Sequence, residues 1–126
     1  MGIWARGATA TDLLEALGLG LYALMTDLRK VRPLEEKAVS AAGSDPAELV
    51  VAFLTELLLL EQTEQFIGRE IRARTLGSPP TAIVASVAGE RFDAARHPAR
   101  TEVKAVTLHG LEFDPAGGRA RVIVDI

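Results

Sequence analysis

The sequence predicts an α+β protein in which two helices pack on a mostly antiparallel β-sheet. Two observations carry this prediction. Leucines recur at helical spacing in two segments of the first half, and runs rich in Val and Ile, separated by Gly and Pro, dominate the second half. The chain has 126 residues, which favours one domain over two, and a core of that size needs no disulfide or structural metal. We therefore expect residues 1–126 to form a single domain.

A short strand over residues 3–6 is expected to lead into the first helix. Thr9 and Asp12 have the spacing of a capping box, in which each side chain satisfies the other's backbone N–H. The leucines that follow share one helical face: Leu13, Leu17, Leu21, Leu24 and Leu28. Gly18 and Gly20 each cost about 1 kcal/mol relative to alanine within a helix, which indicates close approach to another backbone.

The second helix has the clearest start in the chain. Asp45 suits the N-cap, Pro46 suits the first helical position, and Glu48 lies in the first turn. The helix body, residues 49–60, is apolar on nearly every side, which is typical of a central helix covered on most faces. We expect this helix to form the core of the fold.

Strands are expected to fill most of the remaining chain. Their expected ranges are 35–42, 67–76, 81–88, 101–109 and 119–126. An irregular segment over residues 91–98 should separate two of them. Residues 122–124 are apolar on both faces of the last strand, so this strand should lie inside the sheet.

Composition excludes several functional classes. The chain has no cysteine, which rules out thiolate zinc sites, disulfides and cysteine nucleophiles. Its 14 basic and 17 acidic residues give a net charge of −3, so strong direct binding to nucleic acid is not expected. Neither a targeting signal nor a membrane-spanning run is recognisable, and we expect a soluble, cytoplasmic protein.

Few side chains in this sequence are obvious candidates for catalysis or for metal binding. His97 precedes a proline in a polar loop and is expected to be solvated, whereas His109, at a strand end, is expected to make a structural hydrogen bond. The nearby carboxylates of Glu61 and Glu64 are most simply surface charges. No nucleophile–base pair is recognisable, so the residues do not indicate an enzyme.

Two features near the end of the chain are less ordinary. Lys104, on a strand, would share a face with Val106 and Leu108, either as a lysine that snorkels at the sheet rim or as a functional ammonium group. Asp125 and the terminal carboxylate of Ile126 put two anionic groups side by side after a buried strand. Such hard oxygens suit Ca²⁺ or Mg²⁺, but the pair could equally mark only the end of the chain.

Several stretches of the sequence form specific motifs. Residues 96–111 read RHPARTEVKAVTLHGL, and the chain ends in RVIVDI. LMTD at residues 24–27 and LTELL at residues 54–58 accompany them. Together these stretches resemble the archease family, and the resemblance extends over residues 2–126.

The resemblance implies a partner protein rather than an enzyme. Archeases activate RtcB-type RNA ligases, which use GTP and Mn²⁺ to join RNA ends in tRNA splicing and RNA repair, and they promote guanylylation and multiple turnover of the ligase. The implied fold is a strand-helix-strand-strand module with a second such module inserted. The family's important lysine matches Lys104, and two of its metal ligands, the penultimate aspartate and the terminal isoleucine, match Asp125 and Ile126.

One ligand implied by the resemblance is missing from the sequence. Archeases carry His-Thr-Ala-Asp-Val before the Gly-Ile of the first strand, whereas this chain begins Met1-Gly2-Ile3. Asp12 does not correspond to the family's aspartate, because it lies at the start of the first helix. We therefore expect an N-terminally shortened chain, with the aspartate encoded upstream of Met1, that binds Ca²⁺ or Mg²⁺ weakly.

Two functional hypotheses follow. The leading one is a non-catalytic activator of an RtcB-type RNA ligase that acts through Lys104 and the metal-binding end of the chain. The alternative is a stand-alone metal- or small-molecule-binding module that shares only the fold. Multiple-turnover ligation with and without the protein distinguishes the two.

Overall fold

The computed structural model describes all 126 residues. The elements follow in the order β1 (Gly2–Arg6), α1 (Ala10–Met25), a 3₁₀ helix (Leu28–Lys30), β2 (Glu35–Ala42), α2 (Pro46–Glu64), β3 (Phe66–Leu76), β4 (Ala82–Arg91), β5 (Ala105–Asp114) and β6 (Arg119–Asp125). Both predicted helices and all six predicted strands are present. No helix combines the length and the apolar character needed to cross a membrane.

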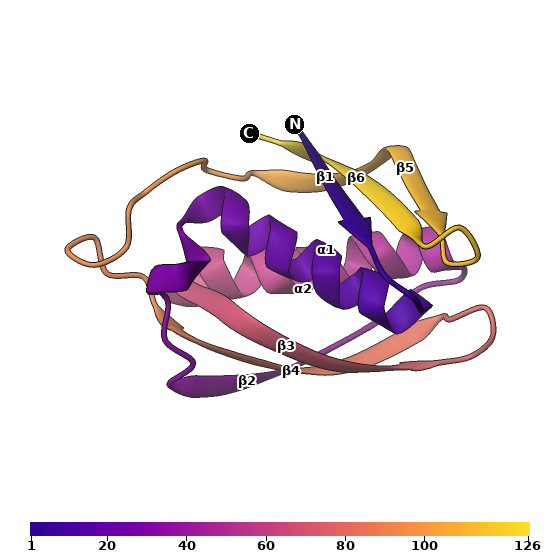
Figure 1. The fold of residues 1–126 in the computed structure, drawn as a ribbon, viewed down its shortest axis with the longest axis horizontal. Coiled ribbons are helices and arrows are strands. Elements are labelled where there is room, and N and C mark those ends of the chain that lie inside the picture. Colours follow the sequence, from indigo (N-terminus) through magenta and orange to yellow (C-terminus); the bar gives the residue numbers. More distant parts are fainter.

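The strands form two three-stranded antiparallel sheets, and the two helices lie between them (Figure 1). One sheet has the order β1-β6-β5 and the other the order β2-β4-β3. In chain order, β1-α1-β5-β6 is a strand-helix-strand-strand module, and β2-α2-β3-β4 is a second one inserted after α1. The predicted α+β class and the inserted-module topology are confirmed. The strands are divided between two sheets, however, where the pattern of helices and strands in the sequence suggested one sheet.

Local hydrogen bonds set both helix starts, but at α1 only half of the predicted capping box forms, because no hydrogen bond joins the Thr9 N–H to the Asp12 side chain. The Oγ1 of Thr9 accepts the N–H of Asp12 at 3.1 Å before α1, and the Oδ1 of Asp45 accepts the N–H of Glu48 at 2.8 Å before α2. Pro46 occupies the first turn of α2, where its missing N–H costs nothing. These caps depend only on neighbours within three residues, which is why the sequence revealed them.

The helix α2 lies at the centre of the hydrophobic core, as its apolar sequence predicted. Its Leu49, Phe53 and Leu57 are fully buried, and the helix packs against both sheets and α1. A Cβ on Gly18 of α1 would lie 2.6 Å from Cδ1 of Ile71 and 2.8 Å from Cδ1 of Leu57. Gly18 therefore makes room for side chains of β3 and α2, not for another backbone as the sequence suggested.

The strand β5 starts and ends later than expected. It runs from Ala105 to Asp114 instead of over residues 101–109, and its register against β6 shifts between Thr107 and Glu112. Gly110 lies in this irregular stretch with a φ of +71°, which a glycine adopts without strain. The predicted strand end at Gly110 is in fact a bulge, after which pairing resumes.

The strand β6 is the central strand of its sheet, as predicted. Its Ala120, Val122 and Val124 are buried against the helices, while Ile123 lies on the outer face and is only partly covered. The strand is central because it pairs on both edges, although only one of its two faces is covered.

Candidate functional site

Lys104, Asp125 and Ile126 lie together at one end of the β1-β6-β5 sheet, which we call the C-terminal edge. The backbone N–H of Lys104 donates to the carbonyl oxygen of Asp125 at 2.7 Å. Across β6, the N–H of Val124 donates to the carbonyl oxygen of Met1 at 2.8 Å, so both ends of the chain lie side by side (Figure 1). The sheet pairing thus gathers three distant segments.

The side chains at the C-terminal edge face solvent. Lys104 and Asp125 are exposed, Ile126 is 55% exposed, and the Lys104 ammonium group forms no ion pair. The predicted apolar row around this lysine is wrong, because Lys104 precedes β5 and Leu108, within the bulge, is 53% exposed. The lysine is a free surface cation rather than a lysine that snorkels from an apolar face.

An open polar groove of about 360 Å³ borders Lys104 at the end of α2. Its lining residues are Glu61, Gln62, Gln65, Glu102, Val103 and Lys104. The Nε2 of Gln62 donates to the carbonyl oxygen of Lys104 at 3.4 Å and ties the groove to the C-terminal edge. Burial, and after it the nearby Glu102 carboxylate, raises the pKa of Glu61, which is half-buried instead of the plain surface charge expected.

Residues 92–104, between β4 and β5, form a strap that crosses the end of α1. The N–H groups of Arg100 and Thr101 donate to the carbonyl oxygens of Met25 and Leu24 at 3.0 and 2.9 Å. These carbonyls belong to the last turn of α1, which has no intrahelical donors for them. The hydroxyl of Thr26 donates to the Pro98 carbonyl at 2.9 Å. The LMTD and RHPARTEVK stretches are therefore two halves of one contact.

A buried ionic network around Glu90 holds the start of the strap. Its carboxylate, with a side chain only 8% exposed, accepts hydrogen bonds from Arg96 at 2.8 and 3.1 Å. Arg32 donates to it through its backbone N–H at 2.7 Å and its guanidinium at 3.0 and 3.3 Å. The Nε2 of His97 lies 3.1 Å away. The hydrogen bonds from Arg96 in particular, with those from Arg32 and His97, hold the pKa of Glu90 well below its usual range, although burial opposes them.

The prediction that His97 is solvated is wrong, because this residue is only 1% exposed. Its Nδ1 accepts the backbone N–H of Asp93 at 2.8 Å. A nitrogen that accepts a hydrogen bond carries no proton, so the proton is on Nε2 and is donated to Glu90. Sequence reasoning missed this network. The only signal was a glutamate at the end of an apolar strand, followed by an arginine and a histidine within seven residues.

His109 also differs from expectation. Its side chain is exposed and makes no hydrogen bond, while its backbone N–H donates to the Oγ1 of Thr107 at 3.1 Å. Glu64 is an exposed charge as expected, paired with Lys37 at 3.0 Å. Neither residue contributes to the C-terminal edge.

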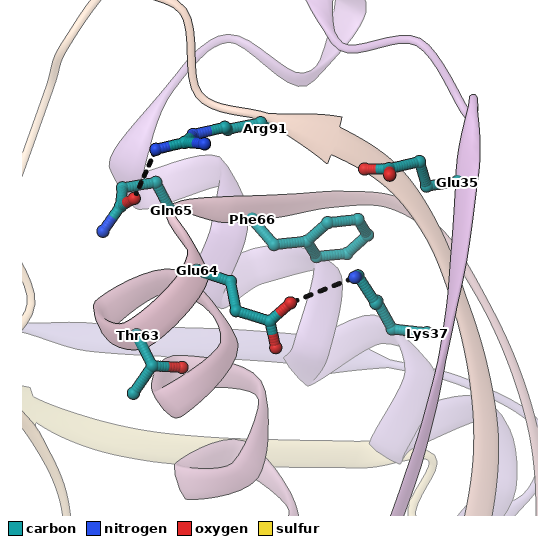
Figure 2. Close-up of a pocket in the computed structure, with 7 residues that line it drawn as sticks. All are labelled: Glu35, Lys37, Thr63, Glu64, Gln65, Phe66 and Arg91. Carbon is teal, nitrogen blue, oxygen red and sulfur yellow. Dashed lines mark hydrogen bonds and ion pairs between the residues drawn. The ribbon is translucent and has the colours of Figure 1, made fainter.

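A second polar pocket, of about 310 Å³, lies between the end of α2 and the start of β2 (Figure 2). Lys37 bridges to Glu64 and lies 5.7 Å from the ring centroid of Phe66, and Arg91 donates to Gln65 at 3.1 Å. Figure 2 shows these groups turned toward one another across the pocket. Most of the polar side chains that line this pocket already pair with one another, so fewer of them are available to a ligand than at the C-terminal edge.

The residues at the C-terminal edge do not by themselves fit a divalent metal ion. Asp125 and the Ile126 carboxylate supply two anionic groups, and no three His, Asp or Glu side chains anywhere in the chain are grouped for a shared ion. Ca²⁺ in proteins usually takes six to eight oxygen ligands, so two exposed carboxylates leave most of its positions to water.

Fold and site together define a small α+β protein of two nested strand-helix-strand-strand modules, with a free lysine, an aspartate and the terminal carboxylate at one exposed edge. Residues 1–126 match the Archease protein family, and the chain belongs to this family. The resemblance found in the sequence is thereby confirmed.

Individual relatives agree with this assignment. The chain is 35% identical over 127 residues to a protein named Protein archease from Methanopyrus kandleri, covering 98% of this chain and 89% of that one. It is 33% identical over 115 residues to Protein archease from Thermococcus gammatolerans, covering 90% and 81%. The solution structure of Methanobacterium thermoautotrophicum protein 1598 is similar with a TM-score of 0.81 at 28% identity, over 99% of this chain and 91% of that one.

Proposed function

We propose that this chain is a non-catalytic activator of an RtcB-type RNA ligase in the cytoplasm, where it promotes guanylylation and multiple turnover of the ligase in tRNA splicing and RNA repair. Membership of the Archease family over the whole chain supports this proposal. The observation that carries it is the hydrogen bond of 2.7 Å between the N–H of Lys104 and the carbonyl of Asp125. It brings Lys104 and Asp125, two of the three residues that the family resemblance singles out, to one exposed edge.

The chemistry of this edge suits contact with a partner that holds phosphates. The Lys104 ammonium group is exposed and has no carboxylate partner, so its charge is available to an anionic group of a docked ligase, GTP or RNA. The strap fixes the backbone on which this lysine stands, through its bonds to α1 and to Asp125. A lysine held in this way can favour one state of the ligase, closed around GTP, by binding that state better than the open one.

The same proposal includes weak binding of a divalent ion, Ca²⁺ or Mg²⁺, by Asp125 and the Ile126 carboxylate. Two exposed carboxylates attract a hard cation but supply too few ligands for a closed site. The proposed role of Lys104 does not depend on that ion.

The test is ligation by an RtcB-type ligase of RNA ends bearing 3′-phosphate and 5′-hydroxyl groups, under multiple turnover, with and without this protein. We expect substoichiometric protein to restore turnover and to raise the fraction of guanylylated ligase. Lys104→Ala should abolish the stimulation, whereas Lys30→Ala, which removes another exposed lysine without an ion pair, should not. Asp125→Asn should also reduce stimulation, because the side chain loses its charge while the backbone hydrogen bond remains.

Two results would contradict the proposal. One is no rise in guanylylated ligase at equal concentrations of protein and ligase. The other is equal stimulation by Lys104→Ala and the unmodified protein. If this chain bound a metal ion or a small molecule but had no effect on any RtcB-type ligase, the stand-alone binding module would be the better account.

A further inference from the structure

An exposed tryptophan surrounded by arginines lies on the outer face of the β1-β6-β5 sheet. Trp4, the only tryptophan of the chain, is 70% exposed, although indole rings are usually well covered. Arg6 follows it on the same face of β1, and Arg119 and Arg121 project from the same face of β6. With Glu112 of β5 these side chains line an open groove of about 330 Å³. We call it the Trp4 groove.

The Trp4 ring is seated but not covered. A Cβ on Gly2 would lie 2.5 to 2.7 Å from two carbons of the six-membered ring of Trp4, so the missing side chain of Gly2 makes the space in which this ring lies. The one cation that stacks on an aromatic ring in the structure is Lys37 on Phe66, and no guanidinium covers Trp4. A large part of the indole surface is therefore free to stack on a flat ligand.

One pair of these arginines weakens the sheet, although across β5 Arg121 and Arg119 face Glu112 and Asp114. Trp4 pairs directly with Arg121 across the strands, and Arg6 pairs directly with Arg119. Like charges directly opposite each other in an antiparallel pair destabilise it. An anionic ligand that bridges Arg6 and Arg119 would relieve this repulsion.

These arginines are only loosely neutralised. Arg119 lies 4.0 Å from Glu112 and 3.8 Å from Asp114, and Arg121 lies 3.9 Å from Glu112, all longer than hydrogen bonds. The side chains of Arg119 and Glu112 are 64% and 50% exposed, and Arg6 forms no ion pair. Pairs this open are weak and salt-screened. The Nε of Arg121 donates to the Gly110 carbonyl at 3.1 Å, but its other N–H groups and those of Arg6 and Arg119 are open to another anion.

We propose that the Trp4 groove binds single-stranded nucleic acid, with a base stacked on Trp4 and adjacent phosphates held by Arg6, Arg119 and Arg121. A nucleotide combines a flat π surface and an anion in one unit, which matches the two kinds of group in the groove. An acidic peptide would use the arginines but leave the indole exposed. The site is small and the chain is acidic overall, so binding is weak, consistent with the absence of strong nucleic-acid binding expected from composition.

The Trp4 groove lies on the same face of β6 as the side chain of Asp125. Arg121 and Asp125 project from the same face of β6, four residues apart, which is about 14 Å along the strand. The phosphates are therefore expected to lie over Arg6, Arg119 and Arg121 and not to reach the C-terminal edge, where Asp125 and the Ile126 carboxylate are anionic. The binding itself needs no ligase, so it can be tested whether or not the proposed function is correct.

The experiment uses the fluorescence of Trp4, which reports on the site alone because no other tryptophan is present. Unlabelled single-stranded RNA of about twelve nucleotides, within the usual range of site sizes, is titrated at low salt. We expect saturable quenching that weakens with salt, with a log–log slope no steeper than about −2 for three arginine–phosphate contacts. DNA of the same sequence is a second arm, and quenching by both or by RNA alone supports the proposal and shows whether the sugar is read.

Variants and further probes complete the test. By anisotropy of labelled RNA, Trp4→Leu should bind roughly 5- to 150-fold more weakly, the effect of losing one stacked base. Arg6→Gln should weaken binding and flatten the salt slope by about 0.7, whereas Arg72→Gln, an exposed arginine of β3 in the other sheet, should change neither. No quenching by RNA or DNA would overturn the proposal, as would equal quenching by polyglutamate, which would make the groove a docking site for an acidic protein.

Discussion

Replacing Glu90 with glutamine should destabilise the protein by about 2–4 kcal/mol at neutral pH. The carboxylate lies within 2.7 to 3.3 Å of six donor nitrogens, five from Arg32 and Arg96 and one from His97. Glutamine would keep one oxygen but put an N–H₂ group against donors that cannot accept a hydrogen bond. This loss of stability is smaller than that expected for a fully buried ion pair, because the side chains of Arg32 and Arg96 are 57% and 35% exposed and can be rehydrated.

The same network predicts how the effect depends on pH. The folded-state pKa of Glu90 lies well below the ordinary value near 4.5, chiefly because of Arg96. A group whose pKa is lowered by folding contributes its stabilisation above the unfolded-state pKa and loses it as the pH falls through the folded-state pKa. The stability difference between the native protein and Glu90→Gln should therefore be constant near neutral pH and shrink as the pH falls below about 4.5.

The assay is urea unfolding followed by far-ultraviolet circular dichroism across this pH range. Glu64→Gln is the matched control, because Glu64 also pairs at 3.0 Å with a cation but is 49% exposed. Its loss should be negligible, since both partners are already hydrated. A loss for Glu90→Gln as small as that of the control, or a loss that stays constant at acidic pH, would refute the reasoning.

Three further predictions concern the core and the C-terminal edge. Leu57→Ala should cost about 2–5 kcal/mol in urea unfolding, because the side chain is fully buried, and a loss below about 1 kcal/mol would contradict this. Gly18→Ala should cost about 1–3 kcal/mol through its contacts with Leu57 and Ile71, but in the Leu57→Ala background its methyl group should partly restore stability; a double variant less stable than Leu57→Ala would refute this coupling. Calorimetric titration with Ca²⁺ should show only weak binding that Asp125→Asn abolishes, and unchanged binding by the variant would exclude Asp125 as a ligand.

Most of the secondary structure could be predicted because its causes are local. The Thr9 and Asp45 caps act within three residues of themselves, and the apolar pattern of α2 is visible without any partner. The end of β5 was misjudged, because a glycine in the sequence does not reveal whether it ends a strand or forms a bulge. Only the partner strand β6, which resumes pairing at Glu112, distinguishes the two cases.

The candidate site was predicted in part. The sequence pattern singled out Lys104 and Asp125 and the family resemblance supported both, but the hydrogen bond that joins them depends on the pairing of β5 with β6. His97 was misjudged because a polar loop sequence gives no indication of a buried carboxylate seven residues away. The Trp4 groove could not be predicted, because the alternation of buried and exposed residues along β1 does not reveal which residues of β6 lie opposite.

By itself, then, the sequence determined the helices, the strands, their approximate ends and the family. The tertiary structure decided that the strands divide into two sheets around the helices, that Glu90 gathers two arginines and a histidine, and that Trp4 lies among three arginines. The physical reason is the range of the forces involved. Helix caps and apolar periodicity depend on residues within one or two helical turns of each other in the sequence. Sheet register and buried ion pairs depend on residues that only the folded chain brings together.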